Sequence, residues 1–239
     1  MKKLLLFGPL LALAAPVAAQ HTEIIGWAGL GLMCYGGQDA VGNASVNYSV
    51  YNGHESGYTN SPYGSRLGAG VALGVRAQRV GQRKGLLAFD LGYEWMHSRT
   101  KVVVVNYYDG ASNTPRAAQG TTYLQTQNLA AFLGLGHRFE LPAFSLDVLA
   151  GPEIAWVFGF RENGSGTFDG SHAWATSGDR SSSVGADARL RADATAWFHR
   201  VGATVSYSHG FINYQGHLTG GSREVYARIL RLGLAYRLR

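Results

Sequence analysis

The chain has 239 residues, of which 46% are hydrophobic and only 15% are charged, and its formal net charge is +6. Soluble domains average roughly 25% charged residues, so this composition is unusual for a cytosolic protein. The 33 glycines follow no collagen-like period, and the single cysteine excludes a disulfide scaffold and a cysteine-based zinc site.

The N-terminal segment has the organisation of a secretory signal peptide. Lys2 and Lys3 precede an apolar run over residues 4–15, and small residues at 17–19 suit cleavage near Gln20. The run is too short to span a bilayer as a helix. Without the two lysines the remainder has 19 basic and 15 acidic residues, and this excess of +4 does not indicate nucleic-acid binding. We therefore expect a signal peptide at 1–19 and one mature domain at 20–239.

The mature domain is predicted to consist of strands, because apolar residues alternate with small or charged ones at a period of two. The alternation is clearest at 144–160 and 226–238. It is ambiguous at 24–35, where both faces are apolar, and near 125–128, where a bulge would shift the phase. The eight predicted strands are 24–35, 67–78, 86–97, 123–139, 144–160, 184–198, 201–213 and 226–238.

The predicted connections alternate in length. Short turns fall at 81–85, 140–143 and 199–200, and long loops fall at 36–66, 98–122, 161–183 and 214–222. Short periplasmic turns and long outer loops are typical of outer-membrane barrels. In lipid an open sheet edge would leave backbone groups unpaired, so the sheet must close. We therefore expect an all-β fold, an eight-stranded antiparallel up-and-down transmembrane β-barrel.

The order and glycine pattern of these segments resemble the outer-membrane β-barrel domain family often labelled PorT-like, which is similar in architecture to OmpX and the OmpA barrel. The resemblance is carried by residues 66–76, 146–156, 207–213 and 230–238. It implies a bacterial outer-membrane location, contact with outer-membrane lipid and with the insertion machinery, no cofactor and no established catalytic residue. The sequence departs from such barrels at its end, where Leu238 and Arg239 replace the usual terminal aromatic residue.

Charged residues recur at strand positions opposite the apolar face, with both signs in similar number. An eight-stranded barrel is just wide enough for its own side chains to fill, so we expect these residues to pair into a polar plug. A narrow solute path and a ligand site are the alternatives. The predicted interior network comprises Arg76, Asp90, Glu94, Asp147, Glu153, Asp187, Arg189, Arg191, Asp193 and Arg231.

Aromatic residues on the apolar face lie near predicted strand ends, as in the girdles of membrane barrels. Tyr226 and Tyr236 are ten residues apart, which corresponds to roughly 23–25 Å along a tilted barrel. The predicted girdle comprises Trp95, Trp156, Phe158, Tyr207, Tyr226 and Tyr236.

The loops are rich in tyrosine, serine, glycine and asparagine, a composition that suits adaptable recognition of an extracellular ligand or protein. A solvated loop over the barrel mouth is the alternative. The candidate recognition residues are Tyr48, Tyr51, Tyr58, Tyr63 and Trp174.

Catalysis is not predicted. Ser206, Ser208 and His209 lie near one strand end, but alternation places the serines and the histidine on opposite faces. The histidines are scattered, so no metal site is expected. We expect a non-catalytic structural or surface-interaction protein of the outer membrane. The alternatives are a narrow porin or solute-transport barrel, a lipid-modifying outer-membrane enzyme, and a soluble lipocalin-like barrel with its apolar face inside.

Overall fold

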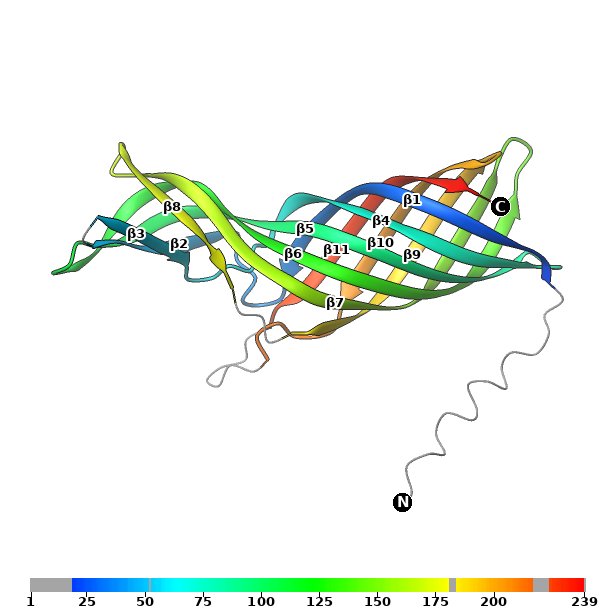
Figure 1. The fold of residues 1–239 in the computed structure, drawn as a ribbon, viewed down its shortest axis with the longest axis horizontal. Coiled ribbons are helices and arrows are strands. Elements are labelled where there is room, and N and C mark those ends of the chain that lie inside the picture. Colours follow the sequence, from blue (N-terminus) through cyan, green and yellow to red (C-terminus); the bar gives the residue numbers. More distant parts are fainter. Residues whose placement is uncertain (1–18, 52, 181–183, 217–223, 239) are drawn as a thin grey trace, which may run out of the picture.

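The computed structural model describes residues 19–51, 53–180, 184–216 and 224–238, so the predicted signal peptide lies outside the described residues except for Ala19. The described residues form eleven strands (Figure 1). They include no helix long and apolar enough to cross a membrane. In chain order the strands are β1 (Ala19–Gly36), β2 (Asn43–Tyr51), β3 (His54–Thr59), β4 (Arg66–Gly81), β5 (Gly85–Tyr108), β6 (Asn113–Glu140), β7 (Ser145–Phe168), β8 (His172–Asp179), β9 (Ala186–Phe198), β10 (Val201–Gly210) and β11 (Tyr226–Arg237).

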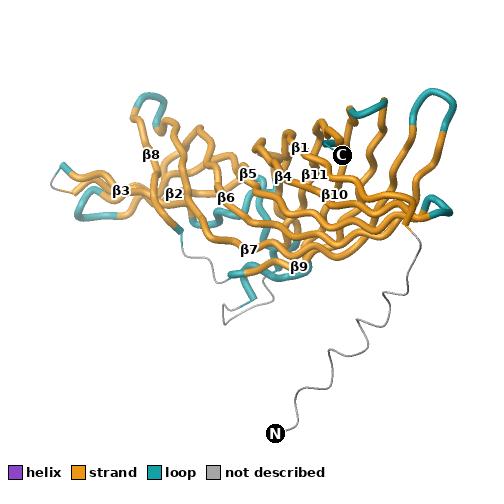
Figure 2. The backbone as a smooth tube through the Cα atoms, turned by 45° about the vertical axis from the view of Figure 1, so that its right-hand side comes forward, coloured by secondary structure: helices purple, strands orange, loops and turns teal. Residues whose placement is uncertain are grey.

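Eight of the described strands form a closed ring, because the pairing of β5 with β6 joins the two ends of the eight-strand order. Figure 2 shows that strands make up most of the backbone and that loops lie mainly at their ends. The order around the ring is β1, β4, β5, β6, β7, β9, β10 and β11, and every neighbouring pair is antiparallel. The ring closes between β11 and β1, where Gly233 pairs with Gly29 and Leu232 with Leu30. These eight strands are the predicted ones, so the predicted fold class is confirmed.

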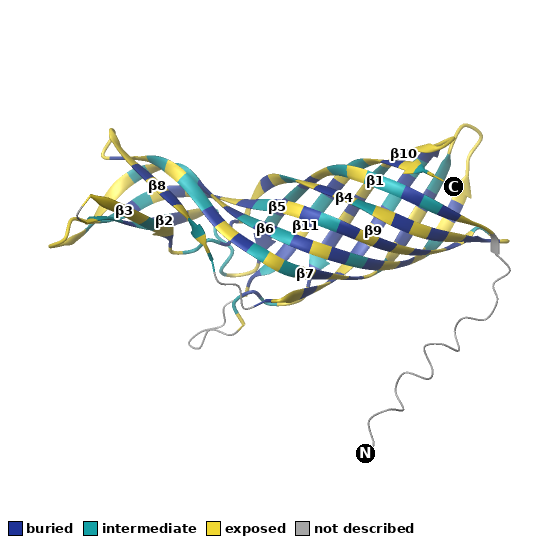
Figure 3. Ribbon diagram, in the orientation of Figure 1, coloured by how far each residue is buried: buried dark blue, intermediate teal, exposed yellow. Residues whose placement is uncertain are grey.

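The ring has an apolar outer face and a buried inner face, which alternate along each strand (Figure 3). Leu135 and Leu234 are 65% and 66% exposed on the outside, while Asp90 and Asp147 on the inside are each 1% exposed. A lipocalin-like barrel would place these apolar side chains around an internal ligand. That alternative is therefore wrong, because the apolar face points outward.

Two of the predicted loops are largely strand. β5 and β6 continue as one hairpin through residues 98–122, and β7 runs to Phe168 and then pairs with β8. The prediction of loops at 98–122 and 161–183 is wrong, because β-branched and aromatic residues extend the strands beyond the apolar belt. The predicted loop at 36–66 likewise contains β2 and β3. Of the predicted loop at 214–222, residues 217–222 lie outside the described part.

The extensions form a second body, here named the distal sheet: β2, β3, β8 and the ends of β5, β6 and β7 beyond the ring. β2 pairs in parallel with β5 and antiparallel with β3, and β8 pairs with β7. The distal sheet lies at one end of the barrel, and the short turns and the C-terminus lie at the other (Figure 1). Its inner face buries a hydrophobic core of Val46, Tyr48, Val102, Val105, Phe168 and Trp174.

Candidate functional site: the barrel interior

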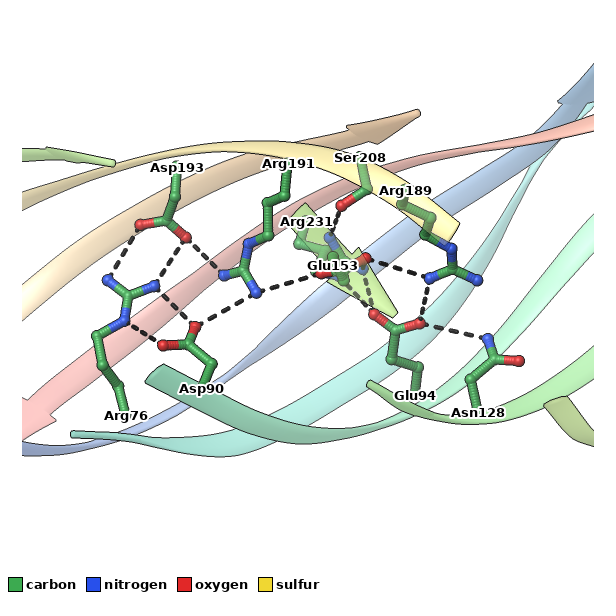
Figure 4. Close-up of polar contacts among 10 residues, drawn as sticks. All are labelled: Arg76, Asp90, Glu94, Asn128, Glu153, Arg189, Arg191, Asp193, Ser208 and Arg231. Carbon is green, nitrogen blue, oxygen red and sulfur yellow. Dashed lines mark hydrogen bonds and ion pairs between the residues drawn. The ribbon is translucent and has the colours of Figure 1, made fainter. Parts of the chain in front are cut away.

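All ten predicted interior residues point into the ring, and none is more than 4% exposed. They come from β4, β5, β7, β9 and β11, so their contacts cross the lumen from several sides. Figure 4 shows these contacts for all of them except Asp147 and Asp187. Alternation along the strands brings them to the inner face, and the narrow ring then forces them together.

The first interior cluster centres on Arg76. Its guanidinium donates to both oxygens of Asp90 at 2.7 and 2.9 Å and to both oxygens of Asp193 at 3.1 and 3.0 Å. Arg191 lies 2.6 Å from Asp193 and 3.3 Å from Asp90. Two arginines thus neutralise two aspartates, with the two-pronged geometry that makes arginine–carboxylate pairs strong.

The second cluster joins two glutamates to two arginines, and the four residues come from four different strands. Arg189 Nη1 lies 3.0 Å from Glu94 and 3.3 Å from Glu153. Arg231 binds Glu94, lies 3.0 Å from Glu153 and donates to Ser208 Oγ at 2.7 Å. These contacts link β5, β7, β9 and β11 through the middle of the barrel.

A third cluster near the short turns contains residues that the sequence analysis missed. Arg138 donates to Glu23 at 2.8 and 2.7 Å and to Asp147 at 2.6 and 2.8 Å. Gln78 and Trp197 both donate to Asp147 at 2.9 Å. Glu23 escaped prediction because both faces of its strand are apolar, and Arg138 because the phase of its strand was ambiguous. Glu23 also lies one residue before the predicted strand at 24–35, and only the structure shows that it shares the inner face with the buried Ile25.

The end of the lumen towards the distal sheet is filled by aromatic rings. Tyr35 packs edge-on against Tyr63 and Tyr214, with ring centroids 5.1 and 5.3 Å apart, and Phe160 lies 6.1 Å from Tyr63. Tyr214 Oη donates to Asp187 at 3.3 Å, which joins this aromatic cap to the charged interior.

Little space remains between these clusters. A cavity of about 20 Å³ lies among Trp27, Arg76, Arg191, Trp197 and Arg231. A water molecule needs at least about 10–15 Å³, so the cavity has room for about one water. The Arg191 guanidinium also lies 4.6 Å from the centre of the Phe132 ring, a cation–π distance that fills the lumen further.

The predicted girdle residues lie on the outer face. Trp95, Trp156, Phe158, Tyr207 and Tyr236 are 42–61% exposed. The remaining one, Tyr226, is half-buried where β11 begins.

Three of the five candidate recognition residues are buried and do not reach solvent. Tyr48 and Trp174 belong to the core of the distal sheet, and Tyr63 belongs to the aromatic cap. Their prediction as exposed loop residues is wrong, because β2 and β8 are strands with an inner face and Tyr63 packs over the lumen. Burial and a hydrogen bond to Glu55 raise the pKa of Tyr48 to about 12. Tyr51 and Tyr58 are 65% and 52% exposed.

The serine and histidine residues considered for catalysis point in different directions. Ser208 is 1% exposed and accepts a hydrogen bond from Arg231 inside the barrel. His209 lies on the outer face, where its ring nitrogen is 3.4 Å from Tyr207 Oη. Among the described residues, no group of three or more histidine, cysteine or acidic side chains is placed to hold a metal ion.

No protein-family model matches the chain, and no curated protein sequence does. Neisserial surface protein A is a similar solved structure, with 10% identity, a TM-score of 0.36, and 92% of this chain and 100% of that chain covered. The attachment invasion locus protein Ail of Yersinia pestis, solved with a heparin analogue, has 9% identity, a TM-score of 0.32 and coverage of 92% and 100%. The outer membrane protein OprG of Pseudomonas aeruginosa has 9% identity, a TM-score of 0.36 and coverage of 92% and 98%. The fold class of this chain rests on its own closed ring of strands.

Proposed function

We propose that the chain is an integral outer-membrane β-barrel with a non-catalytic structural or surface-interaction role. The observation that carries this proposal is the closed ring with an apolar belt outside and paired charges inside. Lipid offers no hydrogen-bond partner for backbone N–H and C=O groups, so a sheet in the membrane must pair all of its strands in a closed ring. An apolar outer belt is stable in contact with lipid. The same belt in water would expose large side chains such as Leu73 and Phe89, which are 54% and 51% exposed.

The short turns and the C-terminus lie at one end of the barrel, which suits the periplasmic side (Figure 1). The distal sheet is then outside the cell, where it is available to an extracellular ligand or protein. We further propose that the chain is cleaved near Gln20, contacts the insertion machinery and belongs to the PorT-like family.

A first test is heat modifiability combined with protease treatment of intact cells. We expect the unboiled protein to migrate faster than the boiled protein, because a closed barrel resists unfolding by detergent. We expect protease to cut only beyond the ring, in the distal sheet. A soluble periplasmic protein without a mobility shift would overturn the proposal.

A plugged barrel is favoured over a narrow porin because the interior clusters and the aromatic cap fill the lumen. In planar bilayers we expect the purified protein to give no discrete conductance steps. The control is a general porin inserted under the same conditions. Regular unitary steps from this protein would instead favour the transport alternative.

The lipid-modifying enzyme gains no support from the candidate residues. Such an enzyme needs a nucleophile and a base within hydrogen-bond reach at the outer rim. Ser208 is occupied by Arg231 inside the ring, whereas His209 lies outside it.

A further inference from the structure

The distal sheet has a second face, opposite its hydrophobic core, which carries a polar groove. Residues on neighbouring strands line up across this face: Tyr58 and Asn106 each pair with Asn47, while Ser56 and Tyr108 each pair with Ser49. The groove has a volume of about 240 Å³. It is lined by Asn47, Ser49, Ser56, Tyr58, Asn106, Tyr108 and Asn113, together with Tyr48, which is itself buried in the hydrophobic core of the sheet.

The floor of the groove is an ordered row of carboxamides. Asn47 Oδ1 accepts hydrogen bonds from Asn106 Nδ2 at 2.8 Å and from Asn60 Nδ2 at 3.1 Å, and Asn47 Nδ2 donates to Asn60 Oδ1 at 2.7 Å. A carboxamide offers two donors and two acceptor positions. These bonds therefore fix the amides while leaving Asn106 Oδ1 and one N–H of Asn47 for a ligand.

Two exposed tyrosine rings belong to the groove. Tyr58 and Tyr108 are 52% and 43% exposed. Tyr108 Oη donates to the Gly110 carbonyl at 3.0 Å, and the Arg180 guanidinium lies 5.8 Å from the centre of the Tyr58 ring. Each ring thus makes one contact within the protein itself.

Strand β3, which supplies one side of the groove, is anchored to the barrel extension. Glu162 Oε1 accepts hydrogen bonds from the backbone N–H and the hydroxyl of Thr59, each at 2.8 Å, and Glu162 is 2% exposed. Arg180 lies 3.0 Å from the other oxygen of Glu162. The groove is therefore built on a fixed edge, and a ligand would meet a preorganised surface.

The chemistry of the lining selects one class of ligand. Every lining residue is uncharged, and the nearby Arg180 is already paired with Glu162, so an anionic ligand would find no uncompensated positive charge there. A pyranose ring matches what remains, because its hydroxyls pair with amides and serines while its C–H face packs on an aromatic ring. We infer that this groove binds a neutral saccharide unit of an extracellular glycan. The inference rests on the proposed function, which places the distal sheet outside the cell.

The test uses the full mature chain purified in detergent micelles and titrated calorimetrically with maltohexaose, cellohexaose, hexa-N-acetylchitohexaose and mannohexaose. Dextran sulfate is the anionic comparison. We expect saturable binding of at least one neutral oligosaccharide. Tyr58→Ala and Asn106→Ala, on different strands, should each weaken that binding about tenfold, the loss typical of one good contact. Tyr51→Ala is the matched control, because Tyr51 is exposed on the same sheet outside the groove lining.

Three results would overturn the inference: no binding of any of the four oligosaccharides, binding of dextran sulfate alone, or equal binding by all variants. Each variant is first checked for the heat-modifiable band of a folded barrel. Because the titration uses purified protein, failure of the inference is separable from failure of the proposed function. Surface protease treatment tests the location, and the titration tests the groove.

Discussion

Replacement of Arg231 by methionine is expected to lower the free energy of unfolding of the barrel by about 3–5 kcal/mol, the usual cost of removing one partner of a buried ion pair. Arg231 donates to Glu94 and to Ser208 and lies 3.0 Å from Glu153. Without it, Glu94 keeps only Arg189 as a cationic partner, and Glu153 shares Arg189 and the more distant Arg191. Urea unfolding of the protein in lipid vesicles, followed by tryptophan fluorescence, measures the change.

The control for this prediction lies on the same strand. Arg228 is exposed on the outer side of β11, and we expect Arg228→Met to change stability by less than about 0.5 kcal/mol. Adding Glu94→Gln to Arg231→Met should recover part of the loss, because it removes one uncompensated charge. Equal stability of the Arg231 and Arg228 variants would contradict the assignment of Arg231 to the interior network.

The interior charges have a further consequence for assembly. Buried ion pairs contribute little net stability compared with well-packed apolar residues, so stability alone does not account for so many of them. A slip of one residue between neighbouring strands would turn the whole inner face outward. In this barrel such a slip would move residues such as Asp90, Glu94 and Arg191 into lipid. The network therefore strongly disfavours wrong strand registers.

The ring of eight strands was predictable from the sequence because apolar and polar residues alternate with a period of two along most of its strands. Alternation placed Arg76, Asp90 and Arg231 on the inner face, and turn lengths set the order of the strands. Glu23 and Arg138 were missed because alternation fails as a signal where both faces of a strand are apolar or where the phase is uncertain.

The distal sheet was not predictable from local pattern. Its key pairing is parallel, between β2 and β5, and joins segments about 60 residues apart, such as Asn47 and Asn106. The aromatic cap likewise brings together Tyr35, Tyr63, Phe160 and Tyr214 from distant parts of the chain. Composition identified these segments as tyrosine-rich, but only the tertiary contacts decide which tyrosines are buried.

The second large effect is expected at Gly136, where β6 and β7 approach closely. A side-chain carbon at this position would meet the carbonyl oxygen of Val148 and would lie 2.8 Å from its carbonyl carbon and 2.9 Å from Leu149 Cα. These are backbone atoms of the neighbouring strand, so they cannot turn aside as a flexible side chain would. We expect Gly136→Val to destabilise the barrel by about 3 kcal/mol or more, the upper range for overpacked sites.

The measurement is the fraction of protein that refolds into vesicles as the heat-modifiable form. Gly26→Ala is the matched control, since a side-chain carbon at Gly26 meets no atom within 4 Å. We expect the control to refold like the unaltered protein and Gly136→Val to remain largely at the unfolded position on the gel. Normal refolding of Gly136→Val would mean that β6 and β7 separate more easily than their continuous pairing implies. The glycine would then be dispensable for closing the ring, and the charged network would carry more of the task of fixing the register.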